Sequence, residues 1–415
     1  MERTRLRVYE VIYKLWFYPT GSLFRIFRML TRIWHGRLGG LRLIMILAIA
    51  LLLFIGLGAI HATHPPHGED RKQLIWIALG LLAFTIANLF HYRRLGRLSY
   101  PLFILSLSLL VLVLVGKYLQ LNSIVPYVRG ASRWINIIPG SSLVRLQPSE
   151  LAKLTYILAL AWYLRHRKNY RTLTGLVAPF TLTLVPMVFI LLQPDLGTVL
   201  LFLPILFAVL FVAGARIKHL LAVVALGILF MPIFYYGLME NYQKERIEGL
   251  FRQNTDDPEW FRGHGYQLYQ SKICIGSGRL TGHGFQLSPY VLYKPTPDQH
   301  NDFIFAIIAH QWGFRGALLV LALYCLIILC GVEIAHSQTD PFGRLLAVGI
   351  TALFAAQMFI NVGMTMGLTP VTGMTLPFIS YGGSSLLTNF LALGLLINVA
   401  RHRPYQIAPK SFEFD

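Results

Sequence analysis

The chain has 415 residues, of which 55% are hydrophobic and only 13% are charged, and its mean hydropathy is +0.57. Soluble globular proteins carry about a quarter charged residues, so this composition excludes an ordinary soluble enzyme and a disordered chain. Three cysteines, Cys274, Cys325 and Cys330, are too few for a disulfide framework in so long a chain. The formal net charge of +19 would suggest nucleic acid in a soluble protein, so its distribution must be considered first.

Apolar stretches long enough to cross a bilayer, about 17–25 residues, recur from residue 41 to residue 400. We predict ten spans, near residues 41–60, 74–92, 101–119, 150–164, 174–192, 197–214, 217–238, 316–335, 345–362 and 383–400. The fourth is short, and residues 303–314 form a marginal stretch that we interpret as a partial or re-entrant helix. The predicted fold class is an all-α polytopic membrane protein of about ten transmembrane helices, with a long external loop at about 239–302 between spans 7 and 8.

Most of the excess of Lys and Arg falls on the side of this topology that carries both termini. Short cytoplasmic loops retain positive charge during insertion, so both termini are predicted to be cytoplasmic. Retention of this kind accounts for the positive charge, and no nucleic-acid partner is needed.

The chain divides into three predicted parts. Residues 1–40 mix Arg and Lys with aromatic residues and Leu, which favours a basic amphipathic helix on anionic cytoplasmic lipid, with a partner-docking segment as the alternative. Residues 41–405 form one membrane domain, and residues 406–415 form a cytoplasmic tail.

Three of the 18 acidic residues, Glu150, Asp195 and Asp302, directly border apolar spans on the external side. An ionisable group there is costly unless it is paired, lines a wet cavity or takes part in chemistry. Glu150 and Lys153 lie three residues apart and share a helical face, so a local ion pair is the simple alternative. For Asp195 the simple alternative is a helix N-cap, which also gains from the helix dipole.

Asp302 precedes the apolar residues from Phe303 and follows an aqueous loop. Partial desolvation at such a boundary raises the pKa of a carboxyl group toward the range of a general base. His300, two residues away, could orient or tune the carboxylate. Farther along, the Gly- and Pro-rich residues 370–385, which include Ser384, interrupt the last pair of spans, and non-helical backbone at membrane depth is tolerated only against protein or a wet cavity. We therefore expect this segment to line a cavity.

Two further features could contact an anionic headgroup. Arg133 beside Trp134 suits a headgroup or sugar at the interface, although ordinary interfacial anchors are the alternative. The glycine-rich residues 272–284 contain Lys272 and Arg279 and could hold a lipid diphosphate on backbone N–H groups, with a flexible loop as the alternative. Their spacing is not that of a nucleotide-binding loop.

Five motifs in order along the chain resemble the SEDS family, which contains RodA and FtsW. They are Gly130-Ala131-x-Arg133-Trp134-Ile135, Gln147-Pro148-Ser149-Glu150-Leu151-Ala152-Lys153, Gln193-Pro194-Asp195-Leu196-Gly197-Thr198, His300-x-Asp302-Phe303-Ile304-Phe305 and the run from Leu376 to Ser385. The resemblance covers residues 41–405. Val371-Thr372-Gly373 and the stretch from Ser271 to Gly278 look more like RodA of elongation than FtsW of division.

This resemblance implies a peptidoglycan glycosyltransferase of the bacterial cytoplasmic (inner) membrane, with an outward-facing active site that polymerises lipid II into glycan strands during cell-wall elongation. The family's essential loop aspartate corresponds to Asp302, which would act as the general base, and other functionally sensitive positions correspond to Glu150, Lys153 and Asp195. Arg133, Lys272 and Arg279 are our own candidates for neutralising diphosphate. The implied partners are lipid II, the growing glycan strand, membrane lipids and a class B penicillin-binding protein, the cross-linking transpeptidase. No cofactor follows with certainty, and a divalent cation, Mg²⁺ or Mn²⁺, stays open.

The chain departs from the family pattern where His310-Gln311 replaces the usual acidic pair, which puts any role of those acids in doubt. Two other functions stay open at this point: a lipid II flippase and a non-catalytic scaffold for the transpeptidase. A role in septal synthesis during division is the alternative to elongation.

Overall fold

The computed structural model describes residues 37–63, 68–128, 131–137, 145–167, 172–237, 239, 241–253, 265–284 and 301–402. A backbone in hydrocarbon must satisfy its own hydrogen bonds, so the apolar stretches form helices. The helices of the first half are α3 (Arg37–Ala62), α4 (Glu69–Leu89), α5 (Tyr92–Arg97), α6 (Ser99–Tyr118), α7 (Pro148–Leu164), α8 (Leu173–Leu191) and α9 (Leu196–Ala213). They are followed by α10 (Ile217–Gly237), α11 (Asn241–Phe251), α13 (Tyr266–Ser277), α15 (Ile304–Ser337), α16 (Pro341–Met366) and α17 (Gly383–Arg401).

Within these described ranges, nine helices are long and apolar enough to cross a membrane: α3, α4, α6, α8, α9, α10, α15, α16 and α17. The predicted short span is α7, which has 17 residues. The prediction of an all-helical protein with many spans is therefore confirmed. The predicted N-terminal amphipathic helix, except for its last residues, and the predicted C-terminal tail lie outside the described residues.

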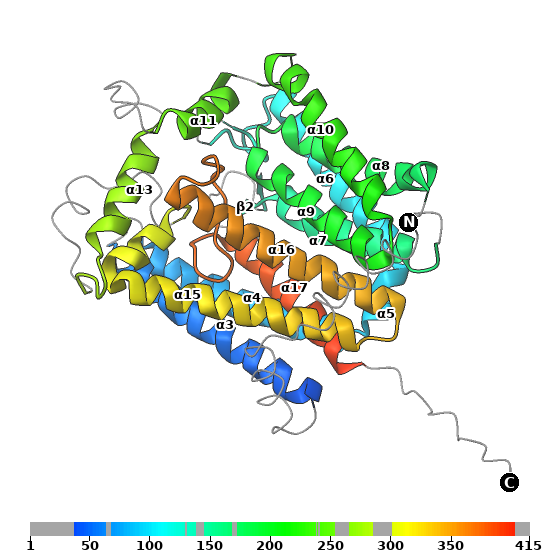
Figure 1. The fold of residues 1–415 in the computed structure, drawn as a ribbon, viewed down its shortest axis with the longest axis horizontal. Coiled ribbons are helices and arrows are strands. Elements are labelled where there is room, and N and C mark those ends of the chain that lie inside the picture. The colour runs from blue at the N-terminus through cyan, green and yellow to red at the C-terminus, as the bar shows by residue number, and fades with distance from the viewer. Residues whose placement is uncertain are drawn as a thin grey trace, which may run out of the picture.

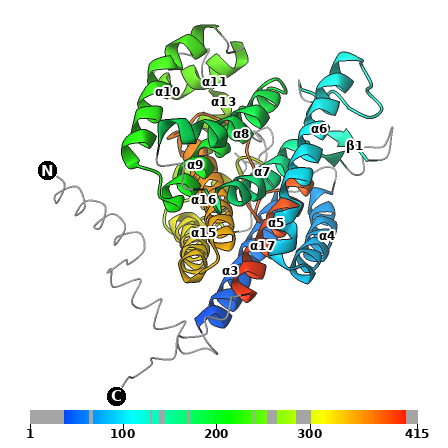
Figure 2. The same ribbon diagram turned by 90° about the vertical axis from the view of Figure 1, so that its right-hand side faces the viewer.

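Helix α7 lies inside the bundle and packs against α5, α6, α8, α9, α16 and α17. Around it, α17 packs on α4, α15 on α3 and α16, and α16 on α9. Figure 1 shows α11 and α13 at one end of this bundle and α5 with the last turns of α17 at the other, and Figure 2 views the bundle from the side of the second end. We call these the loop end and the α5 end.

The connection before α7 contains a small hairpin that the sequence did not predict. Strands β1 (Ile135–Asn136) and β2 (Arg145–Leu146) pair antiparallel, with Ile135 opposite Leu146. The hairpin places Arg133 and Arg145 beside the start of α7.

The marginal stretch at 303–314 forms the first part of α15, which is broken at Gly313 (φ 63°, ψ −160°). The segment 279–284 fills the break. The N–H groups of His283 and Gly284 donate to the carbonyls of His310 and Gln311, and the carbonyls of Arg279 and Leu280 accept from Phe314 and Arg315. Gly282 is required there, because a β-carbon on it would lie 2.2 Å from the Gln311 carbonyl oxygen. Of the glycine-rich residues 272–284, those up to Ser277 belong to α13 and are not a loop, and residues 279–284 complete the broken helix.

Candidate active site

A cavity of about 1030 Å³ opens at the loop end and is lined by residues of α4, α7, α9, α11, α13, α16 and α17 and by residues just before α15. Its wall includes residues 371–375 and 381–385, so the prediction that the interrupted segment lines a cavity is confirmed. Five basic and four acidic residues also line it: Lys72, Arg133, Arg145, Lys153, Arg246, Glu69, Glu150, Asp195 and Asp302. Such a wall can hold a polar, anionic ligand beside hydrocarbon.

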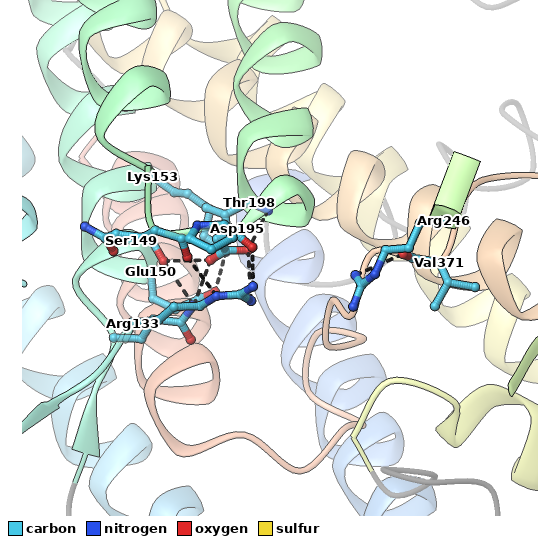
Figure 3. A network of polar contacts seen from close by, with 11 residues as sticks. Arg133, Ser149, Glu150, Lys153, Asp195, Thr198, Arg246 and Val371 are labelled. Atoms are coloured by element: carbon cyan, nitrogen blue, oxygen red, sulfur yellow. Dashed lines mark hydrogen bonds and ion pairs between the residues drawn. The ribbon is translucent and has the colours of Figure 1, made fainter. Parts of the chain in front are cut away.

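Asp195 is the N-cap of α9 and the centre of a polar network (Figure 3). One carboxylate oxygen accepts from the Thr198 hydroxyl (2.9 Å) and the Ser149 hydroxyl (3.2 Å), and the other accepts from the Thr198 N–H (3.3 Å). The Gln147 amide also donates to Asp195, over 3.0 Å. The capping interpretation of Asp195 is confirmed, and its oxygens are satisfied by protein groups.

Gln147 connects this network to α17. Its backbone N–H donates to the hydroxyl of Ser384 over 3.0 Å, and its side chain reaches Ser149 and Asp195. Ser384 lies in the first turn of α17, which has no side-chain N-cap hydrogen bond. The starts of α7, α9 and α17 are thereby held together at one point of the cavity wall.

Glu150 and Lys153 form the predicted ion pair, with 2.8 Å between Oε1 and Nζ. Both are buried on the first turns of α7, and both line the cavity. The second carboxylate oxygen of Glu150 is buried and accepts no hydrogen bond from the described residues. Glu150 thus differs from Asp195, whose oxygens are both occupied.

Arg133 lies at the cavity wall, but its guanidinium is largely engaged. It donates to the carbonyls of Gln193 (2.9 Å) and Pro194 and lies 3.9 Å from Asp195. Trp134, next in the chain, also lines the cavity. Arg133 therefore positions the turn before α9, and only part of its charge can act on a ligand.

Asp302 precedes α15 at another part of the cavity. Its Oδ2 lies 3.3 Å from the point that a β-carbon on Gly373 would occupy, and the Arg246 Nη1 lies 3.8 Å from the same point. Arg246, on α11, donates to the carbonyl of Val371 over 3.1 Å and lies apart from the Asp195 network in Figure 3. His300 lies outside the described residues.

Residues 372–374 connect the Asp195 network with Asp302 and Arg246. A β-carbon on Gly197, between Asp195 and Thr198 in α9, would approach the Thr372 carbonyl oxygen to 2.8 Å, and Gly373 then faces Asp302. One cavity therefore brings together seven of the predicted site residues: Glu150, Lys153, Asp195, Arg133, Trp134, Ser384 and Asp302.

Lys272 and Arg279 are not among the residues that line this cavity. Lys272 donates to Gln253 over 2.5 Å, and Arg279 is exposed on the segment that fills the break of α15. The N–H groups of Gly282, His283 and Gly284 donate to backbone carbonyls. These donors are committed to the fold, so the structure does not place this loop where it could cradle the diphosphate of a ligand in the cavity.

Among the lining residues that the sequence did not point to are Lys72, Arg145, Arg246 and Gln357. The three cations lie among other charged or polar residues and carry no distinguishing local signal. Gln357 does carry one, since it and Asn361 are polar residues four apart within an apolar span, which places them on one helical face. This spacing could have predicted a polar stripe on α16.

A divalent cation would need several carboxylate, His or Cys ligands. Among the described residues, no group of three such side chains is close enough to hold a metal. Two of the cavity's carboxylates are instead engaged by protein groups, Glu150 by Lys153 and Asp195 by hydrogen-bond donors, so we derive no step through a metal ion.

Residues 37–405 match the family model FTSW_RODA_SPOVE, described as cell cycle protein. The chain is 33% identical over 360 residues to the peptidoglycan glycosyltransferase MrdB of Escherichia coli K12, covering 86% of this chain and 93% of MrdB. It is 36% identical over 379 residues to stage V sporulation protein E of Bacillus subtilis, covering 88% and 98% of the two chains.

Two solved structures have the same fold. One, from work on the structural coordination of polymerization and crosslinking by a peptidoglycan synthase complex, gives a TM-score of 0.72 at 30% identity, covering 86% of this chain and 96% of the other. The rod shape determining protein RodA of Thermus thermophilus gives 0.62 at 29% identity, covering 87% and 97%.

Proposed function

This chain belongs to the SEDS family of FtsW, RodA and SpoVE proteins and is a peptidoglycan glycosyltransferase, and we propose that it polymerises lipid II with Asp302 as the general base. The observation that carries this proposal is the position of Asp302. Its carboxylate lies on the wall of a charged cavity, at the junction of the long loop and the first turn of α15.

In the proposed reaction the acceptor is the 4-hydroxyl of the terminal N-acetylglucosamine of lipid II. Asp302 takes the hydroxyl proton as the oxygen attacks the anomeric carbon of the growing strand. A carbon–oxygen bond forms, the bond to the lipid diphosphate breaks, and the configuration inverts in a single displacement. A diphosphate leaves without being protonated, so one carboxylate is sufficient for the proton transfer.

Arg246 supports the departure of the diphosphate. It is the lining cation that approaches Gly373 from the same side as Asp302, and a fixed guanidinium stabilises charge that develops on a leaving group. Lys72 and Arg145 add positive charge at the cavity wall. In this proposal Arg133 and Lys153 mainly hold their carboxylate neighbours, and Lys272 and Arg279 act away from the reacting centre.

The loop end is proposed to face outward, with both termini in the cytoplasm. The α5 end carries Arg93, Arg94 and Arg97 on α5 and its flanks, and Arg344 at the start of α16, as expected for a cytoplasmic surface. All the cavity carboxylates lie at the opposite end, which supports a one-sided active site over a translocation path.

We further propose a role in cell-wall elongation beside a class B penicillin-binding protein. The motif Val371-Thr372-Gly373, which resembles RodA, forms the wall facing Asp302. The similarity to a chain from a peptidoglycan synthase complex supports a transpeptidase partner.

The test uses the purified full chain with lipid II, with and without the cognate transpeptidase. Wild-type protein is expected to form glycan polymer, and Asp302→Asn to be slower by about 10²–10⁴-fold, the usual contribution of a general base. Undiminished polymer from the variant would remove Asp302 from this role. No polymer from wild-type protein with its partner present would favour transport or scaffolding. Complementation of an elongation-defective strain against a division-defective strain tests the cellular role.

A further inference from the structure

Two buried carboxylates on the same cavity wall differ in how many hydrogen bonds their oxygens accept. Asp195 is 5% exposed, and its oxygens accept from Gln147, Ser149 and Thr198. Glu150 is 6% exposed and uses one oxygen for Lys153, while its Oε2 accepts nothing from the described residues. A buried acceptor without a donor is costly, so Glu150 retains a capacity that the fold itself does not use.

A second unused acceptor belongs to another residue of the same cavity wall. The side-chain carbonyl oxygen of Gln357 on α16 is buried and accepts no hydrogen bond from the described residues, and the residue is 2% exposed. Helices α7 and α16 pack against each other, so the two acceptors belong to adjacent elements. Both therefore favour a ligand that presents hydrogen-bond donors.

The charge around Glu150 restricts which chemical groups of a ligand can bind beside it. Lys153 Nζ, 2.8 Å away, neutralises the carboxylate, so a second buried cation would add uncompensated charge. A phosphate group brings acceptors and negative charge, which neither Glu150 nor the Gln357 carbonyl can satisfy. Hydroxyl and amide N–H groups satisfy both without adding charge.

We propose that Glu150 and Gln357 form a sugar-recognition subsite, in which their free oxygens accept hydrogen bonds from a hydroxyl and an acetamido N–H of an N-acetylated sugar. Trp76, Trp134 and Tyr381 line the same cavity and offer aromatic faces to the sugar's apolar side. This inference rests on the proposed polymerase function. In this inference the cations of the cavity wall bind the diphosphate, and the oxygens of Glu150 and Gln357 bind the sugar.

The experiment compares Gln357→Met with Gln311→Met in the full-length protein. Gln311, on α15, is also buried, and its amide atoms have no hydrogen-bond partner among the described residues, but it does not line the cavity. Both substitutions remove an unsatisfied buried amide, so neither is expected to lower the unfolding temperature. Gln357→Met is expected to raise the KM for lipid II about ten- to a hundred-fold, the loss of a hydrogen bond or two, whereas Gln311→Met leaves KM unchanged.

The Glu150–Lys153 pair needs a different variant, because a single change leaves a buried charge. The double variant Glu150→Leu with Lys153→Leu removes both charges. A purely structural pair predicts that this variant folds and polymerises normally. A recognition role predicts a folded protein whose KM for lipid II is raised as in Gln357→Met.

Undecaprenyl diphosphate, which has no sugar, serves as the competing probe. Its inhibition constant is expected to be the same for wild-type protein, Gln357→Met and the double variant. An unchanged KM for lipid II in Gln357→Met, or equally weakened competition by undecaprenyl diphosphate, would overturn the sugar subsite. Neither outcome affects the polymerase assignment, which depends on Asp302→Asn.

Discussion

The side-chain amide of Asn361 donates a hydrogen bond to the backbone carbonyl of Asp302 over 3.0 Å. The same amide donates to the carbonyl of Met374, and Asn361 is fully buried on α16. One side chain thus holds the start of α15 and the wall segment that faces it. The position of the proposed base is set by a helix 59 residues away in the chain.

Replacing Asn361 by Leu removes this link but keeps the volume of the side chain similar. We expect kcat to fall about ten- to a hundred-fold, because a shift of about 1 Å in a catalytic group can cost that much, while the KM for lipid II changes little. Initial polymerisation rates over a range of lipid II concentrations measure both parameters.

Asn398→Leu is the matched control. Asn398 is also fully buried and donates to the carbonyls of Ala87, Asn88 and Phe90, but at the α5 end. It should lower the unfolding temperature without lowering kcat per folded molecule. Equal kcat losses in the two variants would contradict a specific role for Asn361.

Asp195→Ala is expected to destabilise the protein by about 3 kcal/mol, since it removes the N-cap of α9 and leaves Thr198, Ser149 and Gln147 without an acceptor. Thermal unfolding in detergent measures this loss. Asp340→Ala removes the N-cap of α16 at the α5 end, where the carboxylate accepts from Gly343 and Tyr92. Both variants should lower the unfolding temperature, but only Asp195→Ala, at the cavity wall, should also lower polymerisation per folded molecule. An equal effect of the two variants on polymerisation would contradict this prediction.

Alanine substitutions at Gly282 and at Gly284 test the contact between the glycine-rich segment and the break of α15. Both have a φ of +77°, but a β-carbon on Gly282 would lie 2.2 Å from a backbone oxygen, whereas one on Gly284 would meet nothing within 4 Å. Gly284→Ala should cost only the backbone strain, about 1–2 kcal/mol. Gly282→Ala should cost clearly more, because the segment must move out of the break, and differential scanning fluorimetry would show the difference.

Ionisation of Tyr92, which lies at the α5 end outside the membrane-spanning helices, is expected to destabilise the protein at alkaline pH. Burial, together with the neighbouring charge of Asp340, raises the pKa of Tyr92 to about 12 from its ordinary value of 10.0. A raised pKa stabilises the neutral form in the folded state, so this contribution is complete below about pH 10 and is lost as the pH rises toward 12.

Tyr92→Phe cannot ionise, although it loses the 3.0 Å hydrogen bond to Asp340. The variant is expected to be less stable at pH 8 and to lose less further stability between pH 10 and pH 12. Unfolding temperatures at these pH values measure the two slopes, and parallel slopes would show that Tyr92 does not titrate in this way.

The spans were predictable because membrane insertion depends on local properties. The length of an apolar stretch and the charges at its ends determine where a helix can cross hydrocarbon, and α3, α9 and α16 lie close to the predicted ranges. Residues 370–385 could be assigned to a cavity wall for the same reason, since broken backbone at that depth requires polar surroundings. The boundary position of Asp302 is also visible in the chain itself.

The partners of each polar side chain were decided only by packing. Asp195 and Glu150 have the same sequence signature, a carboxylate at the start of a span, but only Asp195 is surrounded by donors, with Gln147 and Ser149 from one segment and Thr198 from another. Arg246 and Gly373 approach Asp302 from distant parts of the chain, and the glycine-rich segment lies in a helix break instead of at the cavity. The length of an apolar stretch acts within one helix, whereas the satisfaction of a buried charge depends on every element packed around it. Only the tertiary structure therefore distinguishes Asp195, whose oxygens are held by the fold, from Glu150, whose Oε2 accepts no hydrogen bond from the described residues.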